Sequence, residues 1–151
     1  LMLTACGHKK QKSKAAQAQS KTQTSPNPKT RITTNQNTEK INQVIKIARS
    51  YTGTPYKYGG TTRVGMDCSG LVYTSYKSIG MELPRTSQAQ SQIGKAVTLG
   101  SEQRGDLVFF TDKKGNTKIT HVGIITEATG PGKARFIHAS TKLGVVENDL
   151  Y

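Results

Sequence analysis

The 151-residue chain has few acidic residues, only two cysteines and no long apolar run. Nine Asp and Glu stand against 22 Lys and Arg, and residues 1–37 hold seven of the basic residues and no acidic one. Hydrophobic residues make up 33 % of the chain, below the usual globular share, which indicates that part of it does not fold. No stretch approaches the ~20 apolar residues that a transmembrane helix needs. The length allows one domain with a sizeable core.

The charge excess favours an anionic surrounding, although a basic tail can equally be a soluble spacer. A membrane surface, a cell-wall polymer and nucleic acid are the candidate partners. Nucleic acid is the least favoured, because the basic residues of the tail have no aromatic-rich binding face beside them.

The first residues, "LMLTACG", resemble a bacterial lipobox, in which cleavage precedes a cysteine that receives diacylglycerol. We therefore expect residues 1–6 to be the end of a lipoprotein signal peptide and Cys6 to be lipidated. A chance match in a cytosolic protein is the alternative. Residues 7–37 are rich in Lys, Gln, Ser, Thr, Ala, Asn and Pro, which predicts a flexible basic linker. The expected location is the periplasmic face of the outer membrane in a bacterial cell envelope.

The folded domain is expected over residues 38–151, with helices first. Thr38 is predicted to cap a helix whose apolar stripe is formed by Ile41, Val44, Ile45 and Ala48. A second helix is predicted from Cys68 to Gly80. Ser87 and Gln90 match a capping box, S-x-x-Q, that would open a short third helix.

Short β-type runs follow at residues 107–111, 119–126, 134–140 and 144–147, separated by turn-forming loops. Helices followed by closely spaced strands predict an α+β domain with an antiparallel sheet. A hairpin around residues 127–132 that pairs Thr126 with Lys133 would set His121 opposite His138. A shift of two residues would still leave the two histidines diagonal neighbours.

Cys68 is the candidate nucleophile in this arrangement. If Cys6 is lipidated, Cys68 has no disulfide partner, which is unusual in an exported protein. At a helix N-terminus the dipole and free N–H groups would lower its pKa and could hold an oxyanion. A nearby His121 could manage the proton and His138 could fix the tautomer of His121. His8 lies in the linker.

Two other interpretations fit the same residues. A buried cysteine is often a small hydrophobe, and a strand histidine is often a core residue. One Cys and two His also match the ligand count of a catalytic zinc, but no C-x-x-C, H-x-E or H-E-x-x-H spacing accompanies them.

Six motifs in order resemble the NlpC-type cell-wall peptidases: "GTPYKYGG", "DCSGLVYTSY", "LPRTSQAQ", "RGDLVFF", "HVGIIT" and "FIHAS". They span about residues 40–148. The resemblance implies a papain-like α+β fold, with N-terminal helices packed on an antiparallel sheet. It also implies an exported thiol protease, a peptidoglycan hydrolase that cuts stem peptides at the D-γ-glutamyl–diamino acid bond.

The resemblance also assigns the site residues. Cys68 is the implied nucleophile, His121 the base and His138 the orienting residue. The residues implied to serve the oxyanion or the substrate cleft are Tyr56, Asp67, Ser69 and Arg85, and a capping role is open for Asp67. No cofactor and no metal are implied. We expect a monomer with no nucleic-acid partner, held at the membrane through Cys6. An amidase or acyltransferase on the same fold, or a non-catalytic wall-binding module, is the alternative function.

Overall fold

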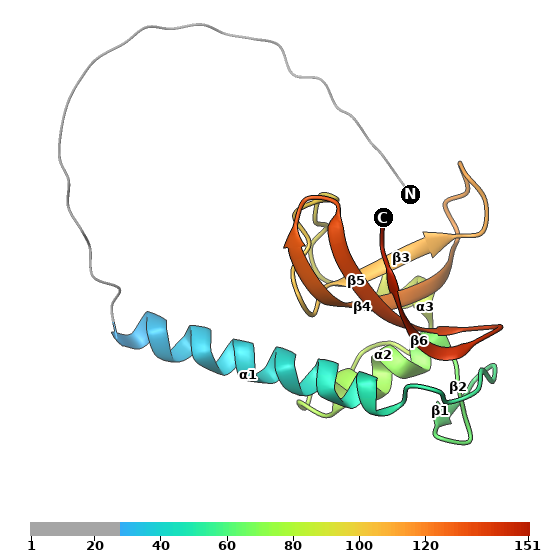
Figure 1. Ribbon diagram of the computed structural model, residues 1–151, viewed down its shortest axis with the longest axis horizontal. Coiled ribbons are helices and arrows are strands. Elements are labelled where there is room, and N and C mark those ends of the chain that lie inside the picture. The colour runs from blue at the N-terminus through green and yellow to red at the C-terminus, as the bar shows by residue number, and fades with distance from the viewer. Residues whose placement is uncertain (1–27) are drawn as a thin grey trace, which may run out of the picture.

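The computed structural model describes residues 28–151, in which a two-stranded antiparallel sheet lies between the first two helices and a four-stranded antiparallel sheet follows the last one (Figure 1). The elements are α1 (Pro28–Ser50), β1 (Thr61–Thr62), β2 (Gly65–Met66), α2 (Cys68–Lys77), α3 (Ser87–Gln90), β3 (Leu107–Thr111), β4 (Ile119–Gly130), β5 (Lys133–Ser140) and β6 (Gly144–Asp149). Strands β1 and β2 pair with each other, and β3–β4–β5–β6 form the larger sheet in that order. The predicted α+β class and antiparallel sheet are confirmed.

Helix α1 is longer than expected. We predicted a start at Thr38, but the helix begins at Pro28, so Thr38 lies inside it and residues 28–37 are helical. Proline suits the first turn of a helix, and no glycine interrupts the residues that follow. Once its C-terminal half is docked, each further residue adds a backbone hydrogen bond without a new nucleation step. In Figure 1 the N-terminal half of α1 projects beyond the sheet. Residues 1–27, with Cys6, His8 and most of the predicted linker, lie outside the described residues.

The core forms where α2 meets the sheet and α1. Helix α2 contacts α1 on one side and strands β4 and β5 on the other. Val44, Ile45 and Ala48 of α1 are buried as the apolar stripe predicted, whereas Ile41 is half-buried. The buried cluster combines these helices with the sheet and consists of Val44, Ala48, Met66, Cys68, Leu71, Val72, Val122, Ile124, Ile137, Ala139 and Val145. Cys68 is thus anchored at the edge of the main core.

The β4–β5 hairpin has a different register from the one expected. Ile124 lies opposite Ile137, and Pro131 and Gly132 make the connection, so Thr126 does not face Lys133. Strand β4 continues to Gly130, and two bulges absorb the additional residues. Residue alternation alone could not reveal these bulges. The two-residue shift makes His121 and His138 diagonal neighbours on one sheet face, as the sequence analysis allowed.

Candidate active site

Cys68 is the first residue of α2 and is 6 % exposed. Asp67 caps this helix, and its Oδ1 accepts a hydrogen bond of 2.6 Å from the Gly70 N–H. Asp67 has extended backbone angles, as an N-cap residue should, and the Leu71 N–H bonds to its carbonyl oxygen. The helix therefore begins at the cysteine because the preceding aspartate satisfies the amides of its first turn. The capping role that the sequence left open for Asp67 is confirmed.

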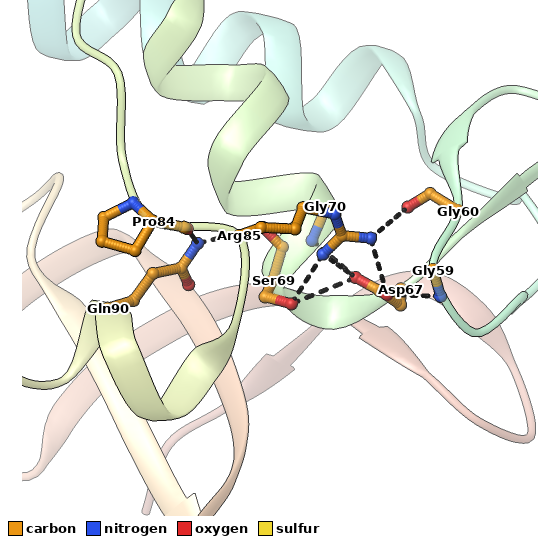
Figure 2. A network of polar contacts seen from close by, with 8 residues as sticks. All are labelled: Gly59, Gly60, Asp67, Ser69, Gly70, Pro84, Arg85 and Gln90. Atoms are coloured by element: carbon orange, nitrogen blue, oxygen red, sulfur yellow. Dashed lines mark hydrogen bonds and ion pairs between the residues drawn. The ribbon is translucent and has the colours of Figure 1, made fainter.

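A closed polar network surrounds this helix start (Figure 2). The guanidinium of Arg85 grips Asp67 with both terminal nitrogens, at 2.9 Å to Oδ1 and 2.8 Å to Oδ2. The same nitrogens donate to Ser69 Oγ at 2.9 Å and to the Gly60 carbonyl at 3.3 Å. The Asp67 carboxylate also accepts from the Gly59 N–H and the Ser69 hydroxyl. Burial opposes the charge on Asp67, but these donors outweigh it and hold the pKa of the carboxyl below its ordinary value.

In this network Asp67, Ser69 and Arg85, which the resemblance placed in the oxyanion site or the substrate cleft, hold other parts of the protein in position. Both terminal nitrogens of Arg85 and the hydroxyl of Ser69 are engaged with protein partners. Asp67 is 5 % exposed, so its carboxylate faces the protein and not the solvent. Together they fix the glycine loop and the "LPRT" segment against the turn that carries Cys68.

Gln90 joins the same region from α3, and the predicted capping box is wrong. Thr86 is the N-cap of α3, with its hydroxyl accepting from the Ala89 N–H at 3.2 Å. The fully buried Gln90 instead turns its amide toward α2, where Nε2 donates to the Ser69 carbonyl at 3.1 Å and the Pro84 carbonyl at 2.8 Å. Sequence spacing could not distinguish a capping glutamine from one that ties two loops together.

The pKa of the Cys68 thiol depends on its burial and on its contact with strand β4. Burial raises the pKa of the Cys68 thiol above its ordinary value, outweighing the stabilising hydrogen bonds from the N–H groups of Val122, Ser69 and Cys68 itself. The expectation of a lowered pKa is therefore wrong, because the helix N-terminus does not compensate for the loss of water. The contact with the Val122 N–H places the sulfur one peptide unit from His121.

The position of the sulfur corresponds to the open end of the β4–β5 hairpin. Pairing between these strands ends at Ile124 and Ile137, so Val122 lies beyond the last pair. Cys68 thus approaches the backbone of β4 two residues beyond the last pair of this hairpin.

His121 and His138 are in direct contact at this end. Nε2 of His121 lies 2.7 Å from Nδ1 of His138, and the rings meet edge to face with centroids 4.9 Å apart. Burial, and then the charge of His138, lower the pKa of His121 to about 4. His121 is therefore a neutral imidazole at pH 7. Phe110 packs against His121 and Phe136 against His138, which limits rotation of the two rings.

The contact between the histidines continues to a residue that the sequence analysis missed. Nε2 of His138 lies 2.9 Å from Oδ1 of Asn148 on β6. An exposed asparagine near a chain end carries no signal of its own. Only the β5–β6 register, which sets His138 opposite Val146 and Phe136 opposite Asn148, brings the amide beside the ring.

Tyr56 lies beside the same helix start. It bridges to Met66, the residue before Asp67, and packs against the buried cluster. Burial, followed by the charges of Cys68 and Asp67, raises the pKa of the Tyr56 phenol. The hydroxyl therefore keeps its proton at neutral pH and can donate a hydrogen bond.

Between residues 28 and 151, no group of three His, Cys, Asp or Glu side chains is arranged to hold a metal ion. Nor does any helix in this range have the length and apolar character needed to cross a membrane.

An α+β domain with a cysteine at a helix N-terminus and histidines on adjacent antiparallel strands has the architecture of the papain-like cysteine peptidases. The model of the NlpC/P60 family matches residues 53–151, and the chain belongs to this family. A solved structure of an NlpC/P60 family protein from Bacillus cereus ATCC 10987 superposes with a TM-score of 0.66 and 34 % identity, covering 73 % of this chain and 35 % of that one. The recognised family and the papain-like fold are confirmed.

Two curated relatives carry names that describe an activity. "Murein DD-endopeptidase MepS/Murein LD-carboxypeptidase" of Escherichia coli strain K12 is 36 % identical over 116 residues, which cover 76 % of this chain and 57 % of the relative. "Gamma-D-glutamyl-L-lysine dipeptidyl-peptidase" of Bacillus cereus strain ATCC 10987 is 39 % identical over 87 residues, which cover 58 % of this chain and 26 % of the relative. The chain thus spans well under two thirds of the length of both relatives.

Proposed function

We propose that this chain is a cysteine endopeptidase of peptidoglycan in which Cys68 is the nucleophile and His121 the base. One observation carries the proposal most directly. The Cys68 sulfur meets β4 at Val122, next to His121, and the His121 ring is held by His138 at 2.7 Å. A thiol, a neutral imidazole and an orienting group are the set that nucleophilic acyl transfer needs.

The pKa shifts favour a reaction that starts from the neutral pair. The raised pKa of Cys68 and the lowered pKa of His121 leave a thiol and an imidazole in the free protein, not a thiolate–imidazolium pair. As the sulfur attacks the substrate carbonyl carbon, His121 takes the thiol proton. The S–C bond forms, the C–N bond breaks, and the same proton passes to the leaving amine. Water then hydrolyses the thioester, with His121 again accepting and returning a proton.

Groups near Cys68 are suited to hold the oxyanion of the tetrahedral intermediate. The backbone N–H groups of Cys68 and Ser69 donate toward the sulfur, whereas the Gly70 N–H already donates to the Asp67 carboxylate. Backbone donors of this kind are fixed in advance and are effective in a site that excludes water. Tyr56 adds a protonated phenol on the same side. We assign Tyr56 to oxyanion assistance, and Asp67, Ser69 and Arg85 to holding the helix start.

The substrate we propose is the peptidoglycan stem peptide, cut at the D-γ-glutamyl–diamino acid bond. The name of the Bacillus cereus relative supports this bond, while the name of the Escherichia coli relative points to the D,D cross-link and to an L,D bond. Incubation with muropeptides of defined stem composition, followed by mass spectrometry, separates the three. A new amino terminus on the diamino acid supports our bond. Opening of the cross-link, or release of terminal D-alanine, would show that another bond is cut. The absence of any product would contradict the proposed enzyme activity.

Variants make the assay specific for the proposed chemistry. Cys68→Ala should abolish cleavage while its circular dichroism spectrum stays that of the wild type. His121→Gln should do nearly the same, since the glutamine cannot accept the thiol proton. Cleavage by Cys68→Ala at the wild-type rate would show that another group performs the reaction, or that the preparation is contaminated. Release of a different amine or acyl product would support the amidase or acyltransferase alternative.

We further propose that Cys6 carries a lipid and that the enzyme works as a monomer on the exported side of the membrane. The lipobox-like "LTAC" and the basic residues after it support an anchor at an anionic envelope. Expression in a bacterium behind a complete export signal, followed by mass spectrometry of the peptide that begins at Cys6, tests lipidation, and Cys6→Ser is the control. Light scattering on the delipidated protein tests the monomer.

A further inference from the structure

We propose that Asn148 is a positioning residue that sets the tautomers of both histidines and leaves Nδ1 of His121 as the proton acceptor. This inference rests on the proposed function and adds a residue to it. Three side chains from three adjacent strands form the chain of contacts: His121 on β4, His138 on β5 and Asn148 on β6. Each lies diagonally across from the next on one face of the sheet.

The direction of the hydrogen bonds follows from Oδ1 of Asn148, which can accept a hydrogen bond but cannot donate one. Oδ1 of Asn148 is a carbonyl oxygen, so Nε2 of His138, 2.9 Å away, has to carry the hydrogen. In its neutral form His138 has one N–H, so its Nδ1 then keeps the lone pair. The contact of 2.7 Å with Nε2 of His121 then requires the hydrogen to be on His121. The remaining nitrogen of His121, Nδ1, is left with the lone pair that a general base needs.

Without Asn148 nothing in the pair itself selects this direction. Two neutral imidazoles can share one hydrogen bond either way. In the reverse direction His138 donates through Nδ1, and Nδ1 of His121 carries a hydrogen and cannot accept one. The carbonyl oxygen of Asn148 breaks this symmetry, and the aromatic packing of Phe110 and Phe136 keeps the rings in place while it does so.

The exposed position of Asn148 allows its effect on the histidines to be measured without an effect on folding. The side chain is exposed at the C-terminal end of β6, two residues beyond Val146, the partner of His138. Truncating an exposed side chain leaves no cavity in the core. We therefore expect Asn148→Ala to fold like the wild type, so that its effect on the histidines can be measured in the folded protein.

The test combines spectroscopy with kinetics. Two-bond ¹H–¹⁵N correlation spectra at pH 7 should show both histidines of the wild type protonated at Nε2, and Asn148→Ala should show a mixture of tautomers. Loss of one hydrogen bond of ordinary strength predicts that kcat falls roughly 2- to 12-fold with KM unchanged. Asn148→Asp, whose carboxylate also accepts from Nε2, should restore the tautomer and most of kcat. Asp149→Ala, the same truncation one residue along, should change neither.

The outcomes separate the two proposals. If the wild type cleaves no muropeptide, the proposed function fails, while the spectra still decide the role of Asn148. If the wild type cleaves but Asn148→Ala keeps both its tautomers and its kcat, the positioning role is overturned. A wild-type spectrum with His138 protonated at Nδ1 would overturn it as well, because the hydrogen bonds would then run in the opposite direction.

Discussion

The ion pair between Arg85 and Asp67 offers a direct test of how the start of α2 is held. Asp67 is 5 % exposed and faces Arg85 across two hydrogen bonds of 2.9 and 2.8 Å. Arg85→Met keeps the length and the apolar stem of the side chain but removes the charge. The carboxylate of Asp67 would then remain inside the protein without its cation.

The cost can be bounded from the surroundings of the two side chains. Removing one partner of a buried ion pair typically costs 3–5 kcal/mol, because the other charge is left uncompensated. The Arg85 side chain is 36 % exposed, and Asp67 keeps the N–H groups of Gly59 and Gly70 and the hydroxyl of Ser69. We therefore expect a smaller loss for Arg85→Met, about 2 kcal/mol of unfolding free energy at pH 7.

The loss should also depend on pH in a particular direction. In the wild type the pKa of Asp67 is held below its ordinary value, so the stability it contributes is lost only as the pH falls through that low folded-state value. In Arg85→Met burial is no longer outweighed by the cation, and the folded-state pKa of Asp67 rises. Protonation then relieves the variant, and the stability difference from the wild type should shrink as the pH falls from 7 toward 4.

Urea unfolding at pH 7 and at pH 4 measures this difference. His121 contributes equally to both proteins, so its own titration cancels. The double variant Asp67→Asn/Arg85→Met, which keeps a capping oxygen but no buried charge, should be more stable at pH 7 than Arg85→Met alone. A difference that stays constant from pH 7 to pH 4, or a double variant that is no more stable, would refute the view that an unpaired Asp67 charge is the cause.

Three shorter predictions concern the same region. Because burial raises the pKa of Cys68, its alkylation by iodoacetamide should be slow at pH 6 and still be rising at pH 9; a plateau below pH 7 would contradict this. His121 titrates at about 4 when folded against about 6.5 when unfolded, so stability is full above pH 6.5 and should fall by up to roughly 3 kcal/mol toward pH 4, with His121→Gln losing less. Gly70→Ala would overlap a backbone carbonyl oxygen and should lower the unfolding free energy by roughly 1–3 kcal/mol, read from urea midpoints. As the control for Gly70→Ala, Ser75→Ala in the same helix removes a buried hydroxyl that has no partner among the described residues and should leave the unfolding free energy unchanged.

The parts of the fold that could be predicted are those where periodicity and turn residues agree. Strand β3, residues 107–111, has the bounds that its alternation indicated, and the helix at Cys68 begins where predicted. The helix at the N-terminus could not be bounded, because residues 28–37 are polar and give no apolar stripe to follow. Polar composition was interpreted there as a linker, whereas helical propagation from the docked half decides the structure.

The histidine contact could be anticipated although the assumed register was wrong. Side chains in a sheet repeat every two residues, so an error of two leaves a residue on the same face and moves it to a diagonal position. His121 and His138 are long enough to meet across that diagonal, at 2.7 Å. An error of one residue would have placed them on opposite faces, and the prediction would have failed.

The thiol shows what an argument from local structure alone leaves out. A helix N-terminus favours a thiolate, and the amides around Cys68 do so here. The decisive quantity is how much water the packed sheet removes from the sulfur, and that depends on Val122 and the rest of the core, which no local motif specifies. If His121 and Cys68 both rest in their neutral forms, the proton moves only when a substrate carbonyl is present to be attacked. A reagent that needs a preformed thiolate should then react slowly with Cys68 at neutral pH, even if the proposed stem-peptide cleavage proceeds at that pH.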